Sequence, residues 1–180
     1  MRVEVTPLMK SKQATPPISV KSHDDKYDLN MDMKAFKGKY VFLNFWISAS
    51  PACLQEQNMI QEMYKELQKE FPDEFELFSI NVDEVRKKAI DFIKKNRIGG
   101  GRFGFTDGVE HRTLFDFGIR SYPSYWLIGK DGKILMSQYE VAQAMRVKPT
   151  MAQIVSDRIN GKDAPTPATQ GEPTKAEPKK

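Results

Sequence analysis

Cysteine is scarce in this sequence: its 180 residues include one, Cys53. A single cysteine excludes a disulfide within the chain, so cysteine usage gives no indication of an oxidising compartment. The two histidines, His23 and His111, stand at no spacing that would complete a zinc site with Cys53. We therefore predict that the chain holds no metal and no cofactor.

Long apolar runs are also missing. The run Tyr40–Trp46 is far too short to span a membrane, and Met1–Val5 lacks the apolar segment of a signal peptide. A composition of 39% hydrophobic and 29% charged residues is typical of a soluble globular protein. We predict one domain over residues 18–160, with an extended lead-in over residues 1–17 and a disordered tail over residues 161–180.

Charge of one sign does not dominate either. The chain has 28 basic and 24 acidic residues and a net charge of +4. The excess is spread along the chain and forms no basic stripe with interleaved aromatic residues. This pattern favours a solvated surface over nucleic-acid binding, so we predict no nucleic-acid partner.

The segment from Tyr40 to Cys53 organises the chain. Tyr40–Trp46 is short, apolar and rich in aromatic residues, which predicts a strand buried on both faces. Ser50 is suited to cap the N-terminus of a helix that begins with Pro51. Cys53 then falls in the first turn of this helix, near the positive end of the helix dipole.

Helical and extended patterns alternate after Cys53. Apolar residues at spacings of three and four predict a helix after Cys53, and Pro72 ends it. A strand is predicted next, over residues 75–82. We predict a second helix that opens at Asp83 and Glu84, with Val85 directed inward.

The C-terminal half adds further elements. Residues 109–117 predict a helix with Leu114 and Phe115 as its apolar centre. Two apolar strands around Asp131–Gly132 predict a hairpin, and a final helix runs from near Pro149 to Gly161.

An N-terminal hairpin completes the pattern, since residues 18–20 and 27–29 alternate apolar and polar around a polar turn. The order of elements predicts an α/β fold, in which a central mixed β-sheet is flanked by helices.

The motif Asn44-Phe45-Trp46, followed by Ser50-Pro51-Ala52-Cys53, resembles the active-site segment of the thioredoxin superfamily in its TlpA/ResA-type branch. In that branch a similar strand leads to Cys-Pro-x-Cys. The resemblance extends over residues 18–160 and implies a thioredoxin fold. Ser50 stands where the family has its nucleophilic cysteine, and Cys53 stands where the family has its second, recessed cysteine.

Other positions resemble the family's site. Pro123, preceded by Tyr122, matches a proline that follows a cis peptide bond and lies against the active-site sulfurs of relatives; a trans proline that opens a strand is the alternative. The resemblance implies that Trp46, Pro51, Tyr122 and Pro123 line a site for a substrate peptide. Glu84 matches an acidic residue suited to proton transfer with the recessed thiol, although a charged residue in a first helical turn is common.

Cys53 has two interpretations. As a functional thiol it would have a pKa lowered by the helix N-terminus and would form a mixed disulfide. As a structural residue it would be a small buried side chain, which we favour because the first cysteine is missing. Ser50 has no evident base or third group to activate it as a nucleophile, and N-capping explains its presence.

Three hypotheses for function follow. In the first, the chain is a thiol–disulfide oxidoreductase family protein with a degenerate site, without dithiol turnover and with at most single-thiol chemistry at Cys53. In the second, it binds a peptide or protein partner beside Pro123 without redox chemistry. In the third, Ser50 was engineered into an active oxidoreductase.

The resemblance also implies where the chain acts and on what. It favours a periplasmic or cell-envelope location, with room for a membrane tether outside this chain; the cytoplasm is the alternative. The expected partner is a protein or peptide, such as one that carries a thiol or a disulfide.

Overall fold

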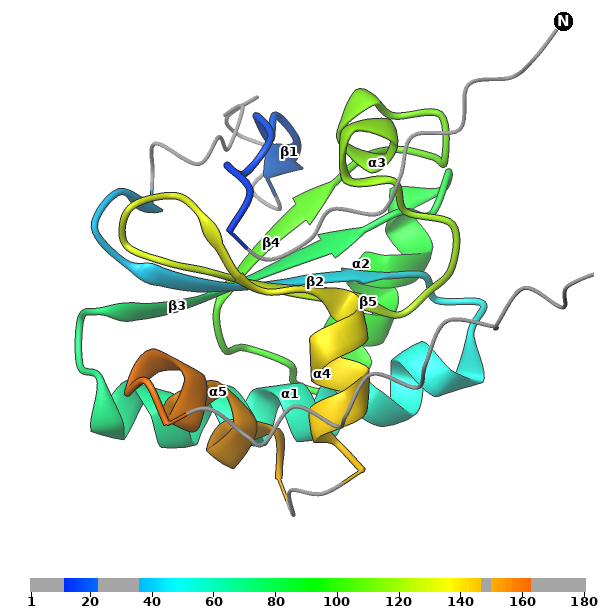
Figure 1. The fold of residues 1–180 in the computed structure, drawn as a ribbon. Helices are drawn as coiled ribbons and strands as arrows, with labels where there is room; N and C mark the ends of the chain where they lie inside the picture. The colour runs from blue at the N-terminus through cyan, green and yellow to red at the C-terminus, as the bar shows by residue number, and fades with distance from the viewer. Residues whose placement is uncertain (1–11, 23–35, 147–149, 163–180) are drawn as a thin grey trace, which may run out of the picture.

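The computed structural model describes residues 12–22, 36–146 and 150–162. These residues form one six-stranded mixed sheet in the order β1-β4-β3-β2-β5-β6, with helices on both faces (Figure 1). The α/β architecture predicted from the sequence is confirmed. In chain order the elements are β1 (Lys21–Ser22), β2 (Tyr40–Trp46), α1 (Pro51–Glu70), β3 (Phe75–Asn81), α2 (Arg86–Lys95), β4 (Arg102–Phe105), α3 (Arg112–Phe117), β5 (Ser124–Ile128), β6 (Ile134–Met136), α4 (Gln138–Ala144) and α5 (Met151–Ile159).

Strand β2 lies at the centre of the sheet. It pairs in parallel with β3 and antiparallel with β5, and every residue after Tyr40 is buried. Because β4 runs parallel to β3, the carboxyl ends of β2, β3 and β4 meet at one edge of the sheet. The amino end of β5 lies at the same edge, since Ser124 pairs with Phe45. This edge carries the loops that hold the candidate site.

Helices α1, α4 and α5 cover one face of the sheet, and α3 lies on the other (Figure 1). The long helix α1 buries Ile60, Met63 and Leu67 in the core beneath it. Each such side chain contributes about 1.5–3 kcal/mol through removal of apolar surface from water. The apolar spacing that predicts this helix therefore also fixes the face on which it packs.

Two predicted helices differ from the structure. Helix α2 begins at Arg86 instead of Asp83, so Val85 precedes it and is 53% exposed. Helix α3 begins at Arg112, and it buries Leu114 and Phe117 while Phe115 is 55% exposed. The inward placement of Val85 was wrong because the helix starts after it, and Phe115 is not at the apolar centre of α3 because this short helix buries only the face that carries Leu114 and Phe117.

Helix α4 was not predicted. It has seven residues with few large apolar side chains, which gives a weak helical period. Ser137 and Glu140 form a capping box at its start, and this Ser-x-x-Glu spacing was the signal that could have located it.

The N-terminal region is described in part. Residues 12–15 run beside β6: the Lys12 amide donates to the Ile134 carbonyl at 2.7 Å, and Ala14 bridges to Lys133. Part of the predicted lead-in therefore contacts the sheet. Strand β1 pairs with β4, whereas the second arm of the predicted hairpin, residues 27–29, lies outside the described residues.

The C-terminal helix α5 ends near Gly161 as predicted, and the tail after residue 162 lies outside the described part of the chain. Among the described helices, none combines the length and apolar character that crossing a membrane requires.

Candidate functional site

The start of α1 places Ser50, Pro51 and Cys53 at the sheet edge where β2 ends. Ser50 caps the helix, with its Oγ accepting a hydrogen bond from the Cys53 amide at 3.3 Å, and Pro51 occupies the first turn. Both local predictions are confirmed. Pro51 is exposed, so the surface of this turn is open to solvent.

The Tyr122–Pro123 segment lies beside this turn. The peptide bond between these two residues is cis, and Pro123 leads directly into β5. Tyr122 packs against the cluster that contains Cys53, and the Cys53 charge contributes to a raised pKa of the Tyr122 hydroxyl, whose larger cause is burial. The structure therefore brings Tyr122, Pro123 and the first turn of α1 together.

Trp46 has a different place from the one implied by the resemblance. It is fully buried in the same cluster as Cys53, and its ring lies 5.8 Å from that of Phe92 in α2. Its side chain falls on the face of β2 that α1 covers. Trp46 thus supports the site from within the core and does not line a surface for a peptide.

Cys53 is 1% exposed. Burial raises the pKa of its thiol above the usual range, because a thiolate is poorly solvated in the core. Hydrogen bonds with the Ser50 side chain and the Ile47 backbone oppose this rise, and the charges of Glu56 and Asp83 add to it. This is the opposite of the lowered pKa that a functional thiol would have, so it supports the structural interpretation favoured from the sequence.

Glu56 is a site residue that the sequence reasoning missed. It lies three residues after Cys53, so both face the same side of α1. Burial raises the pKa of its carboxyl, and its Oε2 has no hydrogen-bond partner among the described residues. A carboxyl group in this setting can exchange a proton near the thiol. The Cys-x-x-Glu spacing was the signal that could have identified it.

Glu84 lies elsewhere. It is exposed in the loop between β3 and α2, with its side chain beside Gly108. The carboxylates whose charges act on Cys53 are Glu56 and Asp83, and Glu84 is not among them. A role of Glu84 in proton transfer stays a prediction.

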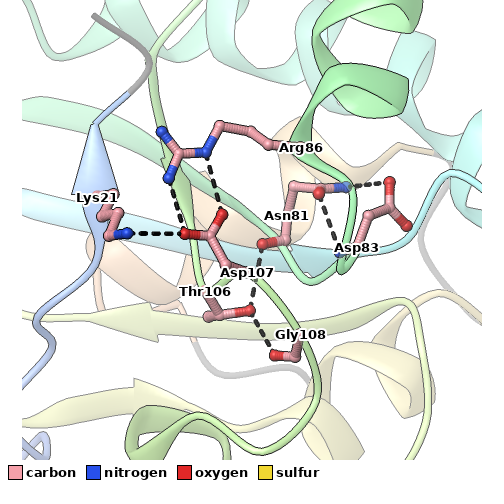
Figure 2. A network of polar contacts seen from close by, with 7 residues as sticks. All are labelled: Lys21, Asn81, Asp83, Arg86, Thr106, Asp107 and Gly108. Carbon is pink, nitrogen blue, oxygen red and sulfur yellow. Dashed lines mark hydrogen bonds and ion pairs between the residues drawn. The ribbon is translucent and has the colours of Figure 1, made fainter. Parts of the chain in front are cut away.

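Asp83 joins two loops at the site edge. Its carboxylate accepts hydrogen bonds from the Ser48 amide at 3.0 and 3.3 Å, and from Asn81 Nδ2 at 3.1 Å. Asn81 Oδ1 in turn accepts from the Asp83 amide at 3.0 Å (Figure 2). These contacts hold the loop that carries Ser50 against the end of β3.

A neighbouring network of ion pairs, centred on Asp107, lies at the edge of the sheet formed by β1 and β4. Asp107 accepts two hydrogen bonds from Arg86, at 3.0 and 2.7 Å, and pairs with Lys21 at 3.2 Å (Figure 2). The Arg86 contacts, more than that of Lys21, lower the pKa of the Asp107 carboxyl. Asp107 therefore links β1 to the start of α2, beside the site.

A groove of about 850 Å³ lies away from this edge, between the outer face of α1 and residues 96–100. Lys65, Lys69 and Arg97 line it together with amide side chains. None of the predicted site residues contributes to it, so its size does not bear on the chemistry of Cys53.

The chain is similar to known thiol-disulfide oxidoreductases. The thiol-disulfide oxidoreductase ResA of Bacillus thuringiensis subsp. konkukian is 28% identical over 105 residues, which cover 58% of this chain and 57% of the relative. ResA of Geobacillus thermodenitrificans is 30% identical over 103 residues, covering 55% and 53%. The chain thus matches little more than half the length of these curated relatives.

Solved structures show the same fold. The thioredoxin domain of a thiol-disulfide oxidoreductase from Bacteroides vulgatus superposes with a TM-score of 0.66 at 15% identity, over 86% of this chain and 99% of that domain. A thiol-disulfide oxidoreductase from Bacteroides fragilis gives a TM-score of 0.60 at 21% identity, over 83% and 96%.

The Redoxin family model matches residues 10–154, most of the chain. This chain therefore belongs to the Redoxin family and has the thioredoxin-like fold of the ResA-type thiol–disulfide oxidoreductases to which it is similar.

Proposed function

We propose that this chain is a thiol–disulfide oxidoreductase family protein of the cell envelope that has lost dithiol turnover and holds a polypeptide partner at its former active site. The observation that carries the proposal is the pair Ser50 and Cys53. A hydroxyl stands in the position of the nucleophilic sulfur and caps the helix, while the one thiol is buried and has a pKa raised by that burial.

The chemistry of exchange explains the loss. A dithiol reaction needs an accessible thiolate to attack a disulfide, and then a second thiol to release the product. The Ser50 hydroxyl is not appreciably ionised near neutral pH and has no base in hydrogen-bond contact among the described residues. One sulfur can complete the first step at most.

The exposure of residues beside the cis peptide bond supports the binding proposal. Pro51 and Ala52 are exposed, and Tyr122 and Pro123 are half-buried beside them. A polypeptide can lie across these two segments without contact with the Cys53 sulfur. The envelope location and the protein partner are proposed by similarity to ResA-type proteins, as is a membrane tether outside this chain.

The position of Glu56 near Cys53 supports a second candidate function, single-thiol chemistry at Cys53. In that step the Cys53 proton passes to the Glu56 carboxylate, and the thiolate attacks a partner disulfide. A mixed disulfide forms, and the departing partner sulfur leaves as a thiolate that takes up a proton from water. The step requires the first turn of α1 to open, because Cys53 is buried.

Binding of a thiol-free peptide tests the first candidate in the absence of any redox chemistry. We would titrate ¹⁵N-labelled protein with carboxymethylated insulin B chain and compare the Cys53→Ser variant. Shifts confined to residues 50–52 and 121–124, and equal in both proteins, are expected. Absence of shifts at these residues would contradict the binding proposal.

The third hypothesis, an engineered Ser50, concerns the origin of the residue. A cysteine at position 50 in the natural gene would establish it, whereas a serine there would exclude it.

A further inference from the structure

A belt of buried polar side chains crosses the core beneath α1. It consists of Asn44 in β2, Gln57 in α1, Ser79 in β3 and Tyr125 in β5, and we call it the polar belt. Gln57 is 1% exposed, and the other three are also buried. Buried amide and hydroxyl groups of this kind require hydrogen-bond partners.

Strand register brings three members of the belt together. Asn44 is the direct partner of Ser79 in the parallel pair and of Tyr125 in the antiparallel pair. Side chains at paired positions point to the same face of a sheet, so these three share one face.

The order of residues along β2 and α1 places Gln57 level with Asn44. Along β2, Asn44 lies between Phe42, which belongs to the same apolar cluster as Ile60, and Trp46, which belongs to the same cluster as Cys53. Along the buried face of α1, Gln57 likewise lies between Cys53 and Ile60. Gln57, on the helix, and Asn44, on the sheet, therefore both lie at the boundary between the same two apolar clusters.

The hydrogen bonds within the belt do not satisfy its members. Asn44 Nδ2 donates to Ser79 Oγ at 3.1 Å. Four other polar atoms have no partner among the described residues: Asn44 Oδ1, both amide atoms of Gln57 and the Tyr125 hydroxyl. An unsatisfied buried group costs about 1–3 kcal/mol, so four of them would be a large fraction of the stability of a single domain.

We propose that the polar belt is an internal water-binding site. The unpartnered atoms are all neutral, and they include donors from Gln57 and Tyr125 as well as acceptors from Gln57 and Asn44. Water, which donates two hydrogen bonds and accepts two, matches this mixed set, whereas a cation would match the acceptors alone. Buried water in proteins binds polar groups of this kind.

This site lies one helical turn from Cys53 and is independent of the proposed partner binding. It implies that the N-terminal turns of α1 rest on the sheet partly through water-mediated hydrogen bonds, and not through apolar packing alone.

The direct test is magnetisation transfer between water and protein in NMR spectra. The side-chain amides of Gln57 and Asn44 should show cross-relaxation with water of the sign expected for a long-lived bound molecule. A high-resolution crystal structure that shows Gln57 bonded directly to Asn44 or Tyr125, with no water between them, would overturn the proposal.

Stability measurements give an independent readout. Gln57→Met keeps the side-chain shape but removes both amide atoms. If the belt binds water, the variant loses these hydrogen bonds, and its unfolding equilibrium constant should rise roughly five- to thirtyfold. If the belt is dry, the variant removes two unsatisfied groups and should be more stable. Gln55→Met, an exposed position on the same helix, is the matched control and should change little.

Discussion

Ser48 and Asp83, 35 residues apart in the chain, are joined by hydrogen bonds from the Ser48 amide to both oxygens of the Asp83 carboxylate. The contact fixes the loop that leads from β2 into the first turn of α1. It also places a negative charge close enough to Cys53 to help raise the pKa of its thiol. One carboxylate thus has a mechanical and an electrostatic effect on the site.

These two effects of Asp83 can be separated. Asp83→Ala should destabilise the domain by about 1–2 kcal/mol, because the Ser48 amide loses its acceptor. Asp83→Asn keeps one side-chain oxygen as an acceptor and should retain more of this stability. Both variants remove the charge, so both should lower the pKa of Cys53. Urea denaturation and the pH dependence of iodoacetamide labelling measure the two quantities. Equal stability of all three proteins would show that the loop does not depend on this contact.

Glu56 and Glu84 offer a matched pair for the electrostatics of the thiol. Glu56→Gln removes a charge that raises the pKa of Cys53, so the thiolate fraction at a fixed pH increases. Iodoacetamide labelling should become roughly two- to tenfold faster. Glu84→Gln should leave the rate unchanged, since Glu84 is exposed and does not act on Cys53. A larger effect of Glu84→Gln would restore its proposed role in proton transfer.

The Asp107 network predicts a pH dependence of stability. The folded-state pKa of this carboxyl is lowered, mainly by hydrogen bonds from Arg86. Its contribution is therefore present above the unfolded pKa of about 3.9, and it is lost as the pH falls through the folded value. Asp107→Asn, which tolerates the left-handed φ of 55° at this position, should cost about 1 kcal/mol or less at neutral pH. The difference from wild type in urea denaturation should shrink toward zero in acid; a constant difference would exclude this origin.

The sequence was most informative where local chemistry determines the structure. Tyr40–Trp46 forms the expected buried strand, because an apolar run of that length needs cover on both faces. Ser50 caps α1, because its hydroxyl and the proline after it satisfy the first turn without help from the rest of the chain.

Features that depend on distant packing were harder to predict. The exposure of Val85 depends on where α2 starts, and that of Phe115 on which face of α3 meets the sheet. The resemblance implied an acidic residue at Glu84, whose role stays a prediction, and the sequence reasoning missed Glu56, whose charge acts on Cys53 and which shares its helix face. The pKa of Cys53 was open, because the effect of the helix N-terminus opposes that of burial, and the extent of burial is a property of the folded core.

Insulin reduction by the wild-type chain and by Ser50→Cys tests the central claim most directly. The Ser50 side chain already contacts Cys53, so a sulfur in its place lies within reach of a disulfide. We predict that the wild-type protein reduces insulin no faster than the buffer dithiol alone. Ser50→Cys should turn over many equivalents, and Ser50→Cys combined with Cys53→Ala should not. Multiple turnovers by the wild-type chain, or no internal disulfide in oxidised Ser50→Cys, would contradict the assignment of this site.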